Sequence, residues 1–411
     1  MSRNHTSVLI VGAGAAGIGA GRRLADSNVD HLVVEARDRP GGRAFTMEAG
    51  LPFPLDLGCG WFHSADVNPW VTIAEAQGRA IDRTPPPWMR PGPPIGFPLA
   101  EQQEFRAELI AFYGRLHETD PEPDTPASAL VENAGRWRPL LNAVSSYVNG
   151  VELDRISIRD FSRYADSGVN WRTPDGYGAV VAAHARTVKA RFGTAVTAID
   201  RGARPLRVET TGGTITADRV IVTVPTALLA EEAIRFTPSL PDKRDAAAGL
   251  PLGLADKLFL SLRDPEEFEI ETRLFGRTDT AATATYHMRP FGRPCIEVYF
   301  GGAHADALER AGEGAPLDFA LNELTALLGA KFRSRVAPLT GTAWRTDPLA
   351  RGSYSYALPG HAPDRERLAR PVENVLFFAG EACSPDAFST AHGAYETGVA
   401  AAEQAMASLT R

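Results

Sequence analysis

Three glycines near the start of the chain have the spacing of a phosphate-binding turn. Gly12, Gly14 and Gly17 follow an apolar, β-branched run at residues 6–11, and a helical segment then extends to Asp26. The first glycine allows a sharp turn, the second lets backbone approach a pyrophosphate, and the third lets the helix pack closely on the strand. The helix N-terminus adds free N–H groups and a partial positive charge. This pattern predicts a dinucleotide site.

The next residues distinguish between kinds of dinucleotide. A second apolar run, His31–Val34, ends at Glu35, where an acceptor for ribose hydroxyl groups is expected. The basic, glycine-rich sequence RPGGR follows at residues 39–43. A nicotinamide nucleotide does not need this second segment, whereas the longer flavin dinucleotide needs the additional cation and N–H contacts. We therefore predict a flavin.

The C-terminal part of the chain repeats the order of strand, glycine and helix. Residues 375–379 are an apolar run, a glycine and Glu381 follow, and either Ser389 or Thr390 is expected to cap a last helix at residues 391–409. The N-terminus of this helix would point at the pyrimidine edge of a flavin. Its partial positive charge would stabilise an anionic reduced ring.

The remaining elements indicate two domains that are interleaved along the chain. Nucleotide-domain elements are expected as a helix at 178–191 and as strands at 195–200, 206–210, 214–217, 219–224 and 375–379. The intervening segments carry a mostly helical region at 101–148, strands at 257–262 and 295–300, and a helix at 317–328. We predict an α/β fold with a discontinuous, Rossmann-like nucleotide domain (1–80, 175–255 and 346–411) and an α+β substrate-binding domain (81–174 and 256–345).

These motifs resemble the flavin-containing amine oxidases, which include monoamine oxidases, polyamine oxidases and flavin histone demethylases. The resemblance rests on GAGAAG at 12–17, Glu35, RPGGR, DLGCGWFH at 56–63, and the sequences FAGEA and STAHGAYETG between 378 and 398. It implies non-covalent FAD in a two-domain architecture like that of amine oxidases and p-hydroxybenzoate hydroxylase. The positions it assigns to FAD are Gly12, Gly14, Ala15, Ala16, Gly17, Glu35, Ala36, Arg37, Gly42, Arg43, Gly58, Cys59, Gly60, Trp61, Val196, Trp344, Gly380, Glu381, Thr390 and Ala391.

Lys257 has the most specific implied role. By itself, a lysine that opens an apolar strand is more often a solvated surface residue. The resemblance instead implies a lysine that holds a water molecule against flavin N5, and burial there is expected to depress its pKa.

Several other residues are implied to form the amine site. Trp344 would line the flavin, and Tyr354 would form one wall of an aromatic cage, a surface that suits an amine. The opposite wall falls at Thr390, so the cage is one-sided. Ser353 stands where monoamine oxidases carry the cysteine that attaches flavin, and this implies that FAD is not covalently bound. His63 either hydrogen-bonds a substrate amine or is a loop histidine satisfied by backbone.

The implied reaction is the oxidation of an amine C–N bond to an imine, which water hydrolyses, with O2 reduced to hydrogen peroxide. Lys257, Tyr354 and Trp344 would be the catalytic residues. Alternatives are an L-amino-acid oxidase, a flavin dehydrogenase or desaturase, and a flavin-binding protein without turnover. Residues that would favour particular substrates are arginines for a carboxylate (Arg163, Arg172, Arg289) and acidic residues for a polyamine (Glu104, Asp166, Asp175).

Length, charge and hydropathy argue against several other classes of protein. The 411 residues suit two domains, and a net charge of −7 argues against a nucleic-acid partner. No stretch is apolar enough for a membrane span, and a strand that begins by Thr6 leaves no room for a signal peptide. Three scattered cysteines lack metal spacing, so we expect no metal and a cytoplasmic protein. A homodimer stays open. The proline-rich segment 85–98 is interpreted as an exposed loop, in preference to a wall of the substrate entrance carrying Trp88 and Phe97.

Overall fold

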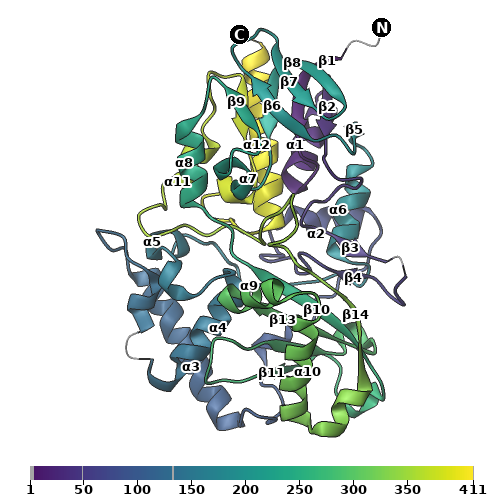
Figure 1. Cartoon of the computed structure of the whole chain (residues 1–411), viewed down its shortest axis with the longest axis vertical. Coiled ribbons are helices and arrows are strands. Elements are labelled where there is room, and N and C mark those ends of the chain that lie inside the picture. The colour runs from purple at the N-terminus through teal and green to yellow at the C-terminus, as the bar shows by residue number, and fades with distance from the viewer. Residues whose placement is uncertain (1–3, 49, 132–133, 411) are drawn as a thin grey trace.

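A computed structural model describes residues 4–48, 50–131 and 134–410, and the structural statements below concern these residues. Figure 1 shows an elongated molecule in which both chain termini lie at the same end. The two ends of the molecule each contain one large β-sheet. We propose that these sheets form the cores of the two predicted domains.

The nucleotide-domain sheet is built around β1 (His5–Val11), whose residues Val8, Leu9 and Ile10 are fully buried. β1 pairs in parallel with β2 (His31–Val34) on one side and β8 (Gly213–Val222) on the other. The remaining strands of the sheet are β5 (Ala190–Arg191), β6 (Val196–Asp200), β7 (Leu206–Thr210), β9 (Arg235–Thr237) and β15 (Leu376–Phe378).

Helix α1 (Ala15–Asp26) lies against α12 (Ala391–Leu409), so the two ends of the chain meet on one face of this sheet (Figure 1). Small residues such as Ala20 and Ala402 are fully buried in the core cluster that both helices share. The bounds of α1, β2 and α12 match the sequence prediction. Other helices of this end are α2 (Pro69–Ala76), α6 (Tyr177–Ala185), α7 (Thr226–Ala230), α8 (Pro241–Gly249) and α11 (Asp364–Ala369).

Two details of the prediction for this sheet are wrong. The helix expected at 178–191 stops at Ala185, because the segment after it turns and pairs with β2 as β5. The two strands expected at 214–217 and 219–224 form one continuous strand, β8. Its first half pairs with β7 in antiparallel fashion and its second half pairs with β1, so no break is needed.

The second sheet is antiparallel, in the order β11 (Thr272–Phe275), β12 (Thr285–Met288), β13 (Cys295–Gly301), β10 (Ala255–Leu262) and β14 (Val336–Gly341). A short hairpin of β3 (Thr46–Met47) and β4 (Leu55–Asp56) lies between the two sheets (Figure 1).

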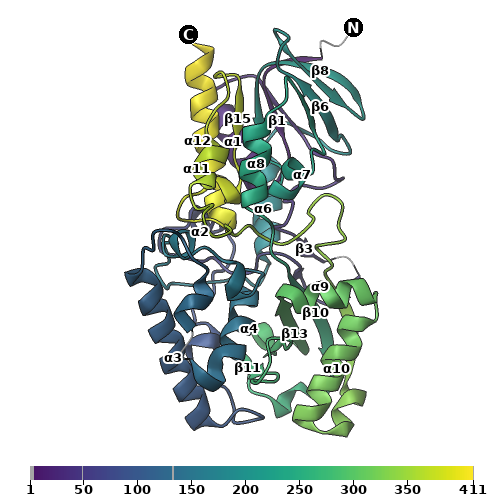
Figure 2. The ribbon, with the colours of Figure 1, turned by 60° about the vertical axis from the view of Figure 1, so that its left-hand side comes forward.

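Helices cover both faces of the second sheet, as Figure 2 shows. On one side are α3 (Leu99–Glu118) and α4 (Arg138–Val148), and on the other are α9 (Gly302–Ala311) and α10 (Ala315–Leu328). The short helix α5 (Ile158–Phe161) contributes Ile158 and Phe161 to the core cluster of α3 and α4. Phe275 and Tyr299 pack on the α3–α4 cluster, whereas Tyr286 and Val298 pack on α10. None of the described helices has the length and apolarity to cross a bilayer.

Candidate active site

A cavity of about 1130 Å³ is lined by residues of both sheets. At the nucleotide end, Val11 and Val34 stand at the carboxyl ends of β1 and β2, where ligands of such folds bind. At the other end, Phe105 and Phe275 come from α3 and β11. The predicted cofactor positions line this cavity except for Gly17, and His63, Lys257 and Tyr354 line it as well.

The glycine turn has the geometry that a phosphate-binding loop requires. Gly12 has φ +104°, and a Cβ there would lie 2.7 Å from Thr223 Oγ1. A Cβ on Gly17 would lie 1.8 Å from Gly12 O, so only glycine allows this contact. At Gly14 a Cβ would meet nothing within 4 Å, and no described side chain caps α1 there. The open backbone and the uncapped N–H groups fit a pyrophosphate.

Backbone donors fix Glu35 at the end of β2. Its Oε2 accepts from Ala13 N at 2.7 Å and its Oε1 accepts from Arg37 N at 2.8 Å. Glu35 is 8% exposed and lines the cavity, where a residue that binds a ribose is expected. The side chain of Arg37 is bound to Asp347, with both carboxylate oxygens 2.9 Å from Nη2. The sequence carried no signal for Asp347, which lies 310 residues away.

Glu381 is the centre of a buried hydrogen-bond network. Arg43 Nη1 lies 3.0 Å from Glu381 Oε1, and Ser355 Oγ donates to Oε2 at 2.6 Å. Burial raises the pKa of Glu381, but Arg43 and the Ser355 hydrogen bond outweigh burial and hold the pKa below its ordinary value. Behind Ser355 lies a buried ion pair in which Arg365 Nε and Asp160 Oδ1 are 2.6 Å apart. The chain therefore keeps Glu381 ionised.

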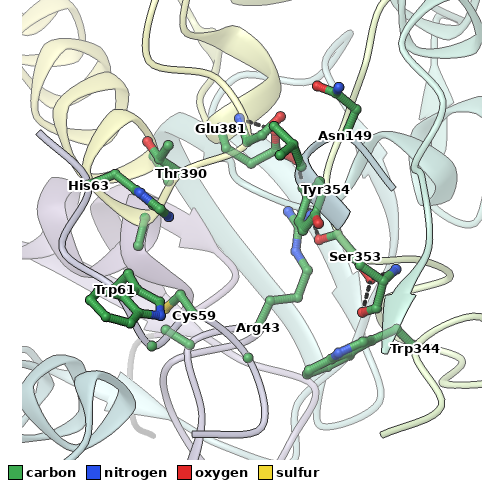
Figure 3. A pocket seen from close by; sticks show the side chains of 18 of the residues that line it. Arg43, Cys59, Trp61, His63, Asn149, Trp344, Ser353, Tyr354, Glu381 and Thr390 are labelled. Carbon is green, nitrogen blue, oxygen red and sulfur yellow. Dashed lines mark hydrogen bonds and ion pairs between the residues drawn. The ribbon is translucent and has the colours of Figure 1, made fainter. Parts of the chain in front are cut away.

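The N-terminus of α12 lies beside this network. Thr390 Oγ1 accepts from Gly393 N at 3.0 Å and donates to Ala387 O at 2.6 Å, so Thr390 is the cap, one of the two candidates predicted. Ser389 instead donates to Ser355 O at 2.6 Å. Figure 3 shows Thr390 and His63 on one side of the cavity and Ser353 and Trp344 on the other.

Lys257 is buried in the cavity wall and is 9% exposed, which contradicts the alternative of a solvated surface lysine. Its Nζ lies 2.9 Å from Glu297 Oε1 and donates to Asp56 O at 2.9 Å. The predicted depression of its pKa is wrong. Burial lowers the pKa, but the Glu297 carboxylate and Asp56 outweigh burial and raise it above the ordinary lysine value. Lys257 is therefore a fixed ammonium group.

The predicted aromatic residues form walls of the same cavity. Tyr354 Oη donates to Tyr147 O at 2.5 Å and lies 3.0 Å from Tyr299 Oη. Both contacts engage the hydroxyl group, so the aromatic ring is the part of Tyr354 that faces the cavity. Burial raises the pKa of Tyr354 well above its usual value, so the phenol stays neutral. Trp344 is buried, and Asp256 Oδ1 accepts from its backbone N at 3.2 Å.

His63 is held by a side chain and not by backbone. Its Nδ1 lies 2.6 Å from Asn170 Oδ1. The alternative that a backbone group is the hydrogen-bond partner of His63 is therefore wrong for this nitrogen. Burial lowers the pKa of His63, and the ring is neutral at neutral pH. Cys59 lines the cavity too, and burial raises the pKa of its thiol to about 12, which suits a packing residue.

Segment 85–98 contributes to the cavity wall, and its interpretation as an exposed loop is wrong at Phe97, whereas Trp88 is 40% exposed and still lines the cavity. Phe97 is 2% exposed and packs on Phe105, with ring centroids 6.3 Å apart. The Trp88 ring lies 4.4 Å from Trp61, and both tryptophans line the cavity. Aromatic packing holds this proline-rich segment against the site.

The three arginines proposed for a substrate carboxylate lie outside the described cavity lining. Arg172 pairs with Asp82 and Glu271, Arg289 donates to Phe268 O at 2.7 Å, and Arg163 is exposed. Of the acidic candidates, Glu104 pairs with Arg136 and Asp175 with Arg79, and only Asp166 lines the cavity.

Sequence reasoning missed Glu297 and Tyr299, which reach the site through strand pairing. Among the described residues, no cluster of three or more His, Cys, Asp or Glu could hold a metal ion.

Comparison with known proteins identifies the family to which the chain belongs. The model of the family "Flavin containing amine oxidoreductase" matches residues 141–406, and that of the NAD(P)-binding Rossmann-like domain matches residues 10–73. Polyamine oxidase 4 of Oryza sativa subsp. japonica is 27% identical over 97% of this chain and 88% of its own length. Polyamine oxidase 2 of Arabidopsis thaliana is 28% identical over 98% of this chain and 88% of its own length.

A solved structure has the same fold. Cyclohexylamine oxidase from Brevibacterium oxydans superposes with a TM-score of 0.80 at 19% identity, over 99% of this chain and 100% of that one. The fold is thus the predicted combination of a Rossmann-like domain and a second sheet domain. With a family match over most of its length, this chain belongs to the flavin-containing amine oxidoreductases and is an FAD-dependent amine oxidoreductase.

Proposed function

We propose that this protein oxidises the C–N bond of a small amine, with non-covalent FAD as the first electron acceptor and O2 as the last. The observation that carries the proposal is one cavity that contains a dinucleotide turn, a buried lysine and two aromatic walls. Gly12, Glu35 and the N-terminus of α12 would hold FAD at one end. Tyr354 and Trp344 would face the amine.

When bound, FAD would supply an acceptor for two electrons and the hydrogen of the amine α-carbon, and O2 would be the final acceptor of the electrons. The substrate R–CH2–NH2 loses two electrons and two protons to become R–CH=NH. Water then converts the imine to an aldehyde and ammonia, while O2 takes up two electrons and two protons to form H2O2.

The chain's own residues bind and orient the substrate. The Tyr354 ring, fixed by two hydrogen bonds to its hydroxyl, offers its face to the amine carbons and excludes water. Neutral His63 has its second ring nitrogen available for the amine, because Nδ1 is engaged by Asn170. The N-terminus of α12 favours negative charge beside it.

Neither Lys257 nor Glu297 acts as a base in this scheme. Lys257 is held as an ammonium group, and the pKa of Glu297 is below its usual value because Lys257 and His287 outweigh burial. Lys257 instead positions a water molecule and contributes a positive charge. The amine must therefore bind deprotonated, and the rate follows the fraction of neutral substrate.

The test is a peroxide-release screen over primary amines, polyamines and amino acids. Lys257→Met is expected to lower turnover with O2, and Lys331→Met, at an exposed lysine, is the matched control. Anaerobic mixing with the same amines should bleach the flavin absorbance. A flavin that stays yellow with every amine would refute the proposal and favour a flavin-binding protein without turnover.

A further inference from the structure

Arg273 is a cation in the cavity wall that has no carboxylate partner among the described residues. It lies on β11 and lines the cavity. Its Nε donates to Thr285 Oγ1 at 2.8 Å, and its guanidinium carbon lies 4.3 Å from the centroid of the Phe275 ring. These contacts fix the stem and one nitrogen, and they leave the two terminal nitrogens without a described hydrogen-bond acceptor. Burial lowers the pKa of Arg273 to about 10, so the group is charged at neutral pH.

Strand register places this cation on the same sheet face as Lys257. Lys257 is opposite Tyr299, Tyr299 is opposite Thr285, and Thr285 is opposite Phe275. Residues directly opposite one another point to the same face of a sheet, and Arg273 is two residues from Phe275 on its strand. Because Arg273 bonds to Thr285, its head group lies two strands from Lys257, or about 10 Å at ~4.8 Å per strand.

The surroundings of Arg273 carry excess positive charge. Arg90 and Arg106 also line the cavity, and each donates to a backbone carbonyl, that of Glu271 and that of Met89. Neither lies within ion-pair distance of a carboxylate in the described part of the chain. The Glu297 carboxylate lies 2.9 Å from Lys257 and so does not compensate them. Arg90 and Arg106 are exposed, whereas Arg273 is partly buried. A guanidinium that is partly removed from water without a counter-charge is destabilised, and an anionic ligand group beside Arg273 would offset that cost.

We infer that Arg273 binds a carboxylate at the far end of the amine substrate, and that the preferred substrates are long-chain ω-amino acids. The inference rests on the proposed amine oxidation. The planar fork of a guanidinium matches a carboxylate in two parallel hydrogen bonds. A separation of about 10 Å between the Arg273 head group and Lys257 suits a carboxylate several methylene groups from the amine. It does not suit an α-amino acid, whose carboxylate is on the reacting carbon.

The same geometry disfavours a diamine or polyamine. A second ammonium group that reached β11 would meet Arg273, with Arg90 and Arg106 nearby, and be repelled. Two cavity carboxylates could attract it, but Glu297 on the sheet face is already paired with Lys257, and Asp166 belongs to the α5–α6 connection and not to the sheet face. The polyamine oxidases to which the chain is similar are therefore expected to differ from it in substrate charge.

The test compares three amines of equal length: hexylamine, hexanediamine and ω-aminohexanoate. Anaerobic flavin reduction should be most efficient with aminohexanoate. Arg273→Met should lower kcat/KM for aminohexanoate about 10- to 100-fold, mainly through KM, and leave hexylamine unchanged. Arg273→Glu should reverse the order in favour of hexanediamine. Arg277→Met, at an exposed arginine paired with Asp279 just beyond the same strand, is the control and should change nothing.

A second measurement does not depend on turnover. Hexanoate, which has the carboxylate but no amine, should bind the FAD-loaded protein in calorimetry, and Arg273→Met should abolish that binding. Such binding supports the anion site even if no amine reduces the flavin, in which case only the proposed function fails. Rapid oxidation of hexylamine without any preference for aminohexanoate, together with no hexanoate binding, would overturn the role of Arg273 and leave amine oxidation standing.

Discussion

The buried pair of Lys257 and Glu297 gives the sharpest energetic prediction. The two charges are 2.9 Å apart, with side chains 10% and 22% exposed. At an effective dielectric constant of about 20, their attraction is about 6 kcal/mol, and desolvation of the two groups offsets part of it. Replacement of Glu297 by Gln removes the carboxylate that is paired directly with a buried ammonium group, which costs about 3 kcal/mol. For a chain of 411 residues that unfolds in one step, each kcal/mol shifts the melting temperature by about 1 °C, so the melting temperature of the variant should fall by about 3–4 °C.

A double-mutant cycle with Lys257→Met separates the interaction energy of this pair from other destabilising effects of the substitutions. Each single variant leaves one buried charge without its partner, whereas the double variant leaves neither. The double variant should therefore be more stable than the sum of the two losses by about 3 kcal/mol. Glu75→Gln, in an exposed pair with Arg83, is the matched control and should cost less than about 1 kcal/mol. Additive losses, or a Glu297→Gln variant that melts with the wild type, would refute the reasoning.

The pH dependence of this deficit follows from the two pKa shifts. The pKa of Lys257 is raised in the folded protein, so its contribution is complete below the unfolded value of about 10.4 and is lost as pH rises through the folded pKa. The pKa of Glu297 is lowered, so its contribution is complete above about 4.3 and is lost as pH falls through the folded pKa. The loss of unfolding free energy in Glu297→Gln, relative to the wild type, should be constant from about pH 5 to about pH 9.5 and become smaller outside that range.

Three further outcomes are expected. Gly17→Val should abolish FAD binding, because its Cβ would lie 1.8 Å from Gly12 O. The measurement is the flavin absorbance of the purified protein, and the control Gly114→Ala, at an open helical position, should retain it. Acid precipitation should release all yellow colour into the supernatant, since Ser353 stands at the position of attachment in monoamine oxidases; colour in the pellet would contradict non-covalent FAD. The kcat/KM for a primary amine should rise tenfold per pH unit toward the substrate pKa. A flat profile between pH 6 and pH 10 would count against binding of the neutral amine.

Local sequence signals predicted the elements whose contacts are local. The run at 6–11, the glycine turn and the helix to Asp26 carry their own strand, turn and helix signals, and the observed bounds of α1 agree. Thr390 was recognised as a possible cap for the same reason. The helix predicted at 178–191 was too long, because pairing of its last residues with β2 competes with helical propensity and is not visible in the segment itself.

The parts of the site that the sequence did not reveal depend on register. Glu297 comes from the strand next to Lys257, 40 positions along the chain, and its charge reverses the expected direction of the lysine pKa. Arg273 lies two strands further, and neither its neighbours in sequence nor its residue type sets it apart from Arg172 or Arg289. The Arg365–Asp160 pair spans 205 residues. Side chains that meet only across strands or domains leave no local pattern.

The interleaving of the first sheet has a consequence for how the protein is made. β1 pairs with β8, about 200 residues later, and Arg43 meets Glu381, 338 residues later. At ~5–20 residues per second, synthesis of the chain takes about 20–80 s. During nearly all of that time the glycine turn exists without Glu381 and α12. Under the proposed roles of Glu381 and α12, the nascent chain carries half of the FAD site until α12 has been synthesised, and full capture of FAD must wait for that helix.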